Sequence, residues 1–119
     1  MNKYLIAAIL WAILILVLTL TPGASVPNYK LFSYDHLGHL AIFSILAFLM
    51  SSGIYAQKQQ MSKSIQLSLL PAIIYGMVIE VIQEYIPGRS MEWLDLLANC
   101  SGSILGISLF YISIKKNWQ

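Results

Sequence analysis

Long stretches without a charged residue limit what this chain can fold into more than any other feature of the sequence. Four such stretches cover residues 4–20, 40–57, 64–79 and 96–114. A helix needs about 20 mostly apolar residues to cross roughly 30 Å of hydrocarbon, and each stretch reaches that length once its polar ends are included. We therefore predict an all-α fold, a polytopic membrane protein whose transmembrane helices pack as a compact four-helix bundle. The predicted helices lie near residues 3–21, 36–56, 65–86 and 93–114.

The composition agrees with a membrane protein and excludes several other classes. Charged residues make up 10% of the 119 residues and hydrophobic residues 58%, whereas a soluble domain carries roughly 25% charged residues. So few charges cannot cover the large surface of a small soluble domain, which excludes a soluble globule and a disordered tail. A net charge of +2 without a basic patch excludes a nucleic-acid partner. The single cysteine, Cys100, excludes an internal disulfide and a cysteine-based zinc site.

The distribution of basic residues predicts the orientation of the chain. The first apolar stretch is longer than the roughly 7–15 residues of a signal-peptide core, so we expect an uncleaved first helix and one domain over residues 1–119. With four spans, five basic residues fall on the side of the termini: Lys3, Lys58, Lys63, Lys115 and Lys116. Lys30 and Arg89 fall on the other side, and this asymmetry predicts that both termini are cytoplasmic.

Polar side chains recur at helical spacing near the outer ends of three predicted helices. Residues three or four apart share a helix face, as in the pairs Asp35–His39, Glu80–Gln83 and Asp95–Asn99. The turn at 86–89 would bring Arg89 to the same end. A carboxylate in hydrocarbon costs at least a few kcal/mol, so these groups must face protein or water. We predict one outward-opening binding pocket formed by Asp35, His39, Glu80, Gln83, Arg89, Asp95 and Asn99.

Two other interpretations of these polar residues have to be weighed. The groups could form only a polar network that joins helices, at roughly 1 kcal/mol per interhelical hydrogen bond. His39, Glu80 and Asp95 could also supply nitrogen and oxygen ligands to a metal. The sequence has no HExxH motif and no second histidine on that face, so we predict neither a metal nor another cofactor. Gly102 and Gly106 match a small-xxx-small pattern and are expected to contact another helix of the same chain.

The ordered set of motifs resembles the VanZ-like family of small bacterial membrane proteins over nearly the whole chain. The matching features are Thr21-Pro22-Gly23 with Pro27, Asp35-x-x-x-His39, Glu80-x-x-Gln83, Pro87-x-Arg89 and Asp95-x-x-x-Asn99-x-x-Gly102-x-x-x-Gly106. The resemblance implies an integral protein of the bacterial plasma membrane, in contact with membrane lipids. The family's named member is associated with resistance to the lipoglycopeptide teicoplanin, which establishes no biochemical activity for this chain.

Two classes of function remain open at this point. The first is a recognition protein that binds the polar headgroup of an amphiphile, such as a lipid-linked cell-wall precursor or a lipoglycopeptide, through Arg89, Asp35 and Glu80. The second is an intramembrane hydrolase or transferase in which Asp35 orients His39 as the general base. Glu80 or Asp95 would then be the acid, and Arg89 would hold a phosphate or carboxylate. A weaker alternative is a proton or small-solute carrier, which would need an oligomer to form a pore. The sequence leaves the oligomeric state open.

Overall fold

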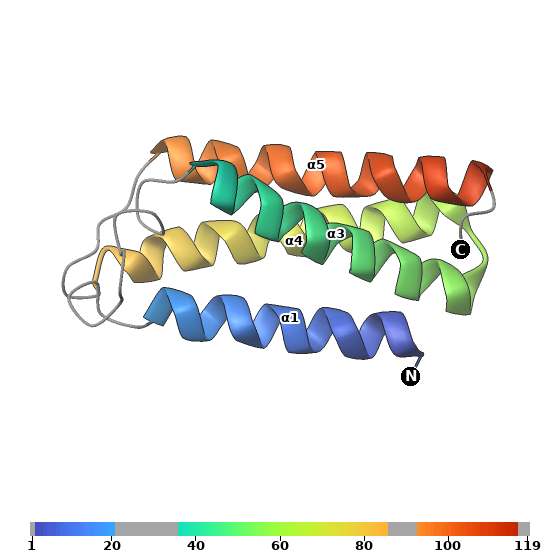
Figure 1. The fold of residues 1–119 in the computed structure, drawn as a ribbon, viewed down its shortest axis with the longest axis horizontal. Helices are drawn as coiled ribbons and strands as arrows, with labels where there is room; N and C mark the ends of the chain where they lie inside the picture. Colours follow the sequence, from blue (N-terminus) through green and yellow to red (C-terminus); the bar gives the residue numbers. More distant parts are fainter. Residues whose placement is uncertain (1, 21–35, 86–92, 117–119) are drawn as a thin grey trace.

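The chain folds into a bundle of long antiparallel helices (Figure 1). The computed structural model describes residues 2–20, 36–85 and 93–116. These residues form α1 (Lys3–Leu20), α3 (His36–Lys58), α4 (Met61–Gln83) and α5 (Trp93–Lys115), with no strand among them. The all-α prediction is therefore confirmed for the described part of the chain.

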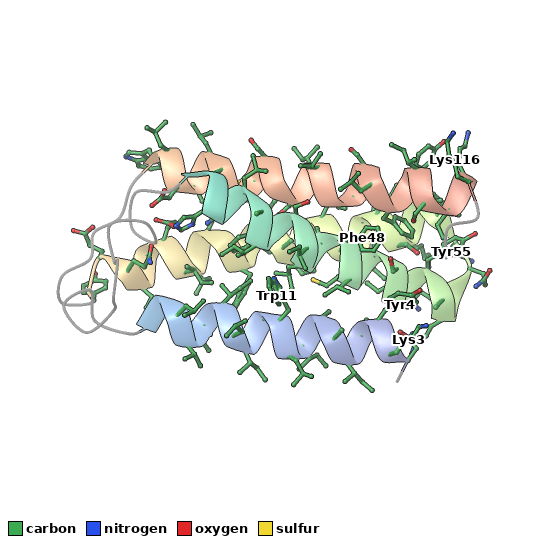
Figure 2. The ribbon with its side chains drawn as sticks, viewed as in Figure 1. Lys3, Tyr4, Trp11, Phe48, Tyr55 and Lys116 are labelled. Atoms are coloured by element: carbon green, nitrogen blue, oxygen red, sulfur yellow. The ribbon has the colours of Figure 1, made fainter. Side chains whose placement is uncertain are left out.

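The helices run alternately up and down, so that the bundle has two different ends. α1 begins, α3 ends, α4 begins and α5 ends at one end, which we call the lysine end (Figure 1). Figure 2 shows Lys3 and Lys116 at this end. The opposite end, where α3 and α5 begin and α4 ends, is called the cluster end.

Three of the helices are long and apolar enough to cross a membrane, which makes the chain a multi-pass membrane protein. They cover Gly38–Lys58, Met61–Gln83 and Trp93–Lys115. The fourth, α1, is apolar but shorter over its described side chains, Lys3–Leu18, so the prediction of four full spans is met by three helices. α1 nevertheless exposes an apolar face that includes Leu10, Ile13 and Val17. Such a face suits contact with lipid better than contact with water.

Most predicted helix limits lie within two residues of the observed ones, and α4 is the exception. The sequence predicted a helix over 65–86, whereas α4 covers Met61–Gln83 and a turn follows at Glu84 and Tyr85. The first turn of α4 is polar and therefore carries no hydrophobic signal, but it is helical. Only Gln59 and Gln60 separate α3 from α4, and Gln59 makes this tight connection with a positive φ of 56°.

α3 and α5 pack closely because glycines of α5 lie against the backbone of α3. A Cβ atom at Gly102 would collide with the carbonyl of Leu40, and one at Gly106 would collide with the carbonyl of Ser44. This arrangement confirms the prediction that both glycines contact another helix of the chain. Small residues in this position allow two membrane helices to approach each other closely.

The interior is a mixture of a small apolar core and buried hydroxyls. Ile15, Phe43, Leu46 and Ile79 form the apolar core between α1, α3 and α4. Several buried serines donate to carbonyls of their own helix, as Ser51 does to Ala47 at 2.7 Å. A hydroxyl bonded in this way is satisfied without a partner on another helix.

α1 is attached to the other helices by polar contacts as well as by apolar packing. The indole nitrogen of Trp11 donates to the carbonyl of Ile42 on α3 at 2.9 Å. The hydroxyl of Tyr75 on α4 donates to the carbonyl of Ala12 at 2.5 Å. Both contacts join a side chain to backbone in the middle of the bundle, where water would not compete for these hydrogen bonds.

Candidate functional site

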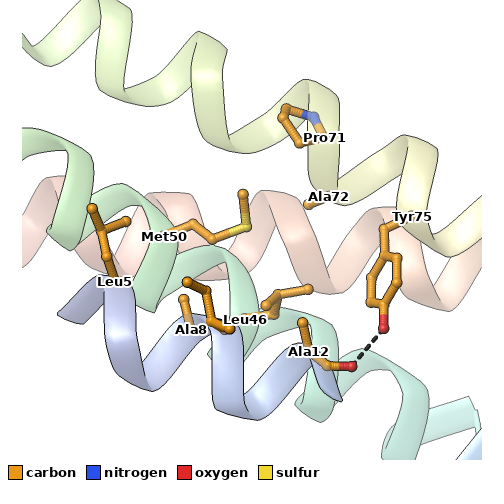
Figure 3. Close-up of a pocket in the computed structure, with 9 residues that line it drawn as sticks. Leu5, Ala8, Ala12, Leu46, Met50, Pro71, Ala72 and Tyr75 are labelled. Atoms are coloured by element: carbon orange, nitrogen blue, oxygen red, sulfur yellow. Dashed lines mark hydrogen bonds between the residues drawn. The ribbon is translucent and has the colours of Figure 1, made fainter. Parts of the chain in front are cut away.

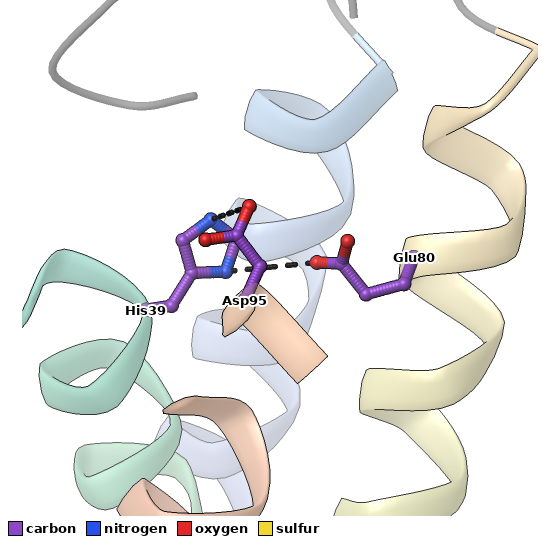
Figure 4. Close-up of side chains that lie close together, drawn as sticks. All are labelled: His39, Glu80 and Asp95. Atoms are coloured by element: carbon purple, nitrogen blue, oxygen red, sulfur yellow. Dashed lines mark ion pairs between the residues drawn. The ribbon is translucent and has the colours of Figure 1, made fainter. Parts of the chain in front are cut away.

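Four polar side chains from three helices meet at the cluster end of the bundle. His39 comes from α3, Glu80 from α4, and Asp95 and Asn99 from α5. Their exposed fractions are 7% for His39, 0% for Glu80, and 1% each for Asp95 and Asn99. Figure 4 shows the His39 ring in contact with the carboxylates of both Glu80 and Asp95. We call these four residues the polar cluster.

The helix ends place the polar cluster at one depth. His39 lies in the first turn of α3, Asp95 in the first turn of α5 and Glu80 in the last turn of α4. Asn99 follows Asp95 by four residues and therefore shares its face. Gly102, one turn further along α5, holds this face against the backbone of α3.

Gly76 on α4 makes room for Asn99. A Cβ atom at this position would lie 3.1 Å from the Asn99 Cβ and 3.3 Å from its Nδ2. Gly76 is one turn before Glu80, so the absence of a side chain there lets α5 bring its amide next to the carboxylate-bearing turn of α4. The pattern of α4 alone does not indicate this function of Gly76, although the four-residue spacing of the small residues Ala72 and Gly76 is visible in the sequence.

The imidazole of His39 is held by an amide and flanked by two acids. Its Nδ1 lies 3.0 Å from Asn99 Oδ1, a hydrogen-bond distance. The same nitrogen is 3.8 Å from Glu80 Oε1, and Nε2 is 3.6 Å from Asp95 Oδ2. Because a carbonyl oxygen can only accept, Nδ1 carries the proton in the contact with Asn99. In a neutral ring, the lone pair is then on Nε2, on the side of Asp95.

This arrangement has the chemical groups for three tasks. Carboxylates accept hydrogen bonds from hydroxyl or ammonium groups of a ligand, and an imidazole can accept or donate a proton. The third task is to hold a metal ion, because one ring nitrogen of His39 lies within 4.8 Å of one oxygen each of Glu80 and Asp95.

The other residues of the predicted pocket fall into two groups. Gln83 is buried on α4, one turn beyond Glu80. Asp35 and Arg89 lie outside the described residues, and their place in the pocket stays a prediction. Glu84, in the turn that follows α4, is exposed.

An apolar groove lies on another side of the bundle, between α1, α3 and α4 (Figure 3). It has a volume of about 340 Å³ and is lined by side chains such as Ile9, Met50 and Pro71. Tyr75 closes one side of it, and Phe43 packs on Tyr75 with ring centroids 6.1 Å apart. The ring of Phe43 also approaches Gly76 beside Asn99, so it stands between the groove and the polar cluster. No sequence pattern predicts the groove, because the groove depends on how α1 packs against α3 and α4.

The membrane-spanning helices and the ionisable groups buried at one end of the bundle identify the chain as a small helical membrane protein. The model of the VanZ/LLP1 family matches residues 4–114, nearly the whole chain. The chain therefore belongs to the VanZ/LLP1 family, as its motifs indicated. No curated protein matches the chain. No solved structure matches it either.

Proposed function

We propose that this protein binds the polar headgroup of an amphiphilic cell-envelope ligand at the polar cluster. The protein would lie in the bacterial plasma membrane with both termini in the cytoplasm, so that the cluster end faces outward. The observation that carries the proposal is the burial of His39, Glu80, Asp95 and Asn99 together at the end opposite the lysines.

The cost of this burial argues for a function beyond helix association. Ionisable groups inside membrane helices are rare, and they usually mark ligand, ion or proton pathways. Hydrogen bonds between membrane helices contribute only about 1 kcal/mol each, and buried serines or one asparagine would provide them at lower cost. Two acids and a histidine from three helices are therefore more than helix association needs.

The orientation is supported by the charges of the described residues. Their five lysines, Lys3, Lys58, Lys63, Lys115 and Lys116, lie at the lysine end, and their acids, Glu80, Glu84 and Asp95, lie at the cluster end. Lysines near helix ends mark the cytoplasmic side. The polar cluster would then be near the outer leaflet, where lipid-linked cell-wall precursors and lipoglycopeptides such as teicoplanin insert.

The chemistry of the site fits a headgroup with hydroxyl, amide and anionic groups. Glu80 and Asp95 can accept hydrogen bonds, and the imidazole of His39 can donate to a phosphate or carboxylate oxygen. The predicted pocket adds Asp35, Gln83 and Arg89.

Binding in a membrane mimic tests the proposal. Teicoplanin and a lipid-linked cell-wall precursor are titrated separately into purified protein in nanodiscs, with a glycopeptide that lacks the lipid chain for comparison. We expect Asp95→Asn to weaken binding at least about tenfold, the effect of losing one charge-assisted contact. Glu84→Gln, which changes an exposed acid at the same end of the bundle, should bind as the unmodified protein does. Absence of binding, or equal binding by both variants, would contradict the proposal.

A second candidate function is an intramembrane hydrolase or transferase acting on a lipid-linked substrate. It is favoured by the position of His39 between Asn99 and Asp95, because a general base needs an oriented imidazole and a nearby acid. Release of a product from a lipid-linked precursor, lost in His39→Ala, would establish this activity. Ligand binding that survives His39→Ala without any product would favour the recognition protein.

A further inference from the structure

We propose that His39, Glu80 and Asp95 bind one divalent transition-metal ion of the zinc type, with Asn99 orienting the imidazole. The site does not depend on the amphiphile proposed above, since it can be measured on purified protein without that ligand.

The spacing of the three side chains is the first argument. Nε2 of His39, the ring nitrogen that the contact with Asn99 leaves for an ion, is 3.6 Å from Asp95 Oδ2. This distance exceeds the roughly 2.7–2.9 Å of a charge-assisted hydrogen bond. An ion with bonds of about 2.0–2.2 Å holds two tetrahedral ligand atoms about 3.4 Å apart. One ligand atom from each residue lies within 4.8 Å of the others, and small side-chain rotations would close this set around an ion.

The set of donor atoms is the second argument, and it selects the kind of metal. One imidazole nitrogen with two carboxylate oxygens suits zinc and its transition-metal neighbours. Calcium and magnesium prefer sites made of oxygen atoms. Three protein ligands leave a fourth position of a tetrahedral ion open for water or for an anionic oxygen of a ligand.

Charge is the third argument. Glu80 and Asp95 together carry two negative charges when ionised, which a divalent ion beside a neutral imidazole would balance.

Asn99 supplies the support that a metal-binding histidine needs. Such histidines usually donate their second ring N–H to an oxygen, which fixes the tautomer and the direction of the ring. His39 Nδ1 makes this contact with Asn99 Oδ1 at 3.0 Å. The Nδ2 atom of Asn99 is buried without a hydrogen-bond acceptor among the described residues, and a water molecule bound to the ion would provide one.

The test is metal binding by the full chain, purified in detergent, freed of any affinity tag and stripped with a chelator. Zinc is titrated against a chromophoric chelator, and elemental analysis gives the number of ions per chain. We expect one ion per chain that an excess of magnesium or calcium does not displace. His39→Ala, Glu80→Gln and Asp95→Asn should each lower the affinity at least about tenfold, and Asn99→Leu should lower it about 10- to 100-fold.

A control variant and a second measurement distinguish a folding defect from the loss of a metal-binding side chain. Glu84→Gln should bind zinc as the unmodified chain does. Cobalt(II) in place of zinc gives a visible spectrum that reports coordination, and it should change in the folded His39→Ala variant. Absence of stoichiometric binding in folded protein, or equal affinity of His39→Ala and Glu84→Gln, would overturn the metal site. Metal binding without amphiphile binding would instead refute only the proposed function.

Discussion

The two ends of the bundle use charge in opposite ways. At the lysine end the charges of Lys58, Lys63 and Lys115 are exposed. Here α3 and α4 are joined by only two residues. At the cluster end, Glu80 and Asp95 are buried between helices. Exposed charges can fix the orientation of a membrane protein without any contact between them. Buried charges need helices that are held in place, and this requirement explains why the tight glycine contact lies next to the polar cluster.

The largest effect is expected for the sidedness of the two ends. On a Cys100→Ala background, Trp93→Cys at the cluster end should react with an impermeant thiol reagent in intact cells. Lys58→Cys should react only after the membrane is opened. Both residues are exposed in the folded chain, so access depends on the side of the membrane alone. Labelling of position 58 from outside would reverse the orientation and remove the outward-facing site.

The next effect concerns the close contact between α5 and α3, which continues from the polar cluster into the middle of the bundle. Gly106→Leu would drive a side chain into the carbonyl of Ser44, which is backbone and cannot move aside. Overpacking costs typically 1–3 kcal/mol and more against backbone, so we expect a fall in melting temperature of about 10 °C or more in detergent. Ser101→Leu, on the exposed face of the same helix, is the matched control and should leave it unchanged. Equal melting temperatures for the two variants would mean that α3 and α5 are not in close contact.

The smallest effect is expected away from both ends, in the middle of the bundle. Tyr75→Phe removes the hydrogen bond to the Ala12 carbonyl while keeping the ring. The expected loss is about 0.5–1.5 kcal/mol of stability, with ligand and metal binding unchanged. Reduced zinc or amphiphile affinity in this variant would show that α1 contributes to the cluster end, in contrast to the separation by Phe43.

Much of the fold follows from patterns that depend on one helix at a time. The uncharged stretches located all four helices, and the pairs Glu80–Gln83 and Asp95–Asn99 identified the inward faces. Gly102 and Gly106 were correctly expected to pack on another helix. The early start of α4 was missed because its first turn is polar, so nothing in its hydrophobicity distinguishes it from a loop.

The remaining features depend on how helices meet, which a single helix pattern does not contain. The groove beside Tyr75 results from the way α1 packs against α4. The space that Asn99 occupies results from Gly76, a residue on a different helix. The pairing of each ring nitrogen of His39 with a different acid also follows from the packing alone. The prediction that Asp35 and Arg89 belong to the binding pocket rests on the sequence alone and stays a prediction.

The central claim is that the polar cluster is a binding site and that the bundle does not need it for stability. The direct measurement is the melting temperature of metal-free protein in which His39→Leu, Glu80→Met, Asp95→Leu and Asn99→Leu are combined. Replacing a buried ionic group by apolar residues of similar size is often neutral or stabilising. We therefore predict a melting temperature within about 3 °C of the unmodified chain, or higher, together with loss of zinc and amphiphile binding. A fall of more than about 10 °C would show that the polar cluster holds the helices together, and would contradict the account.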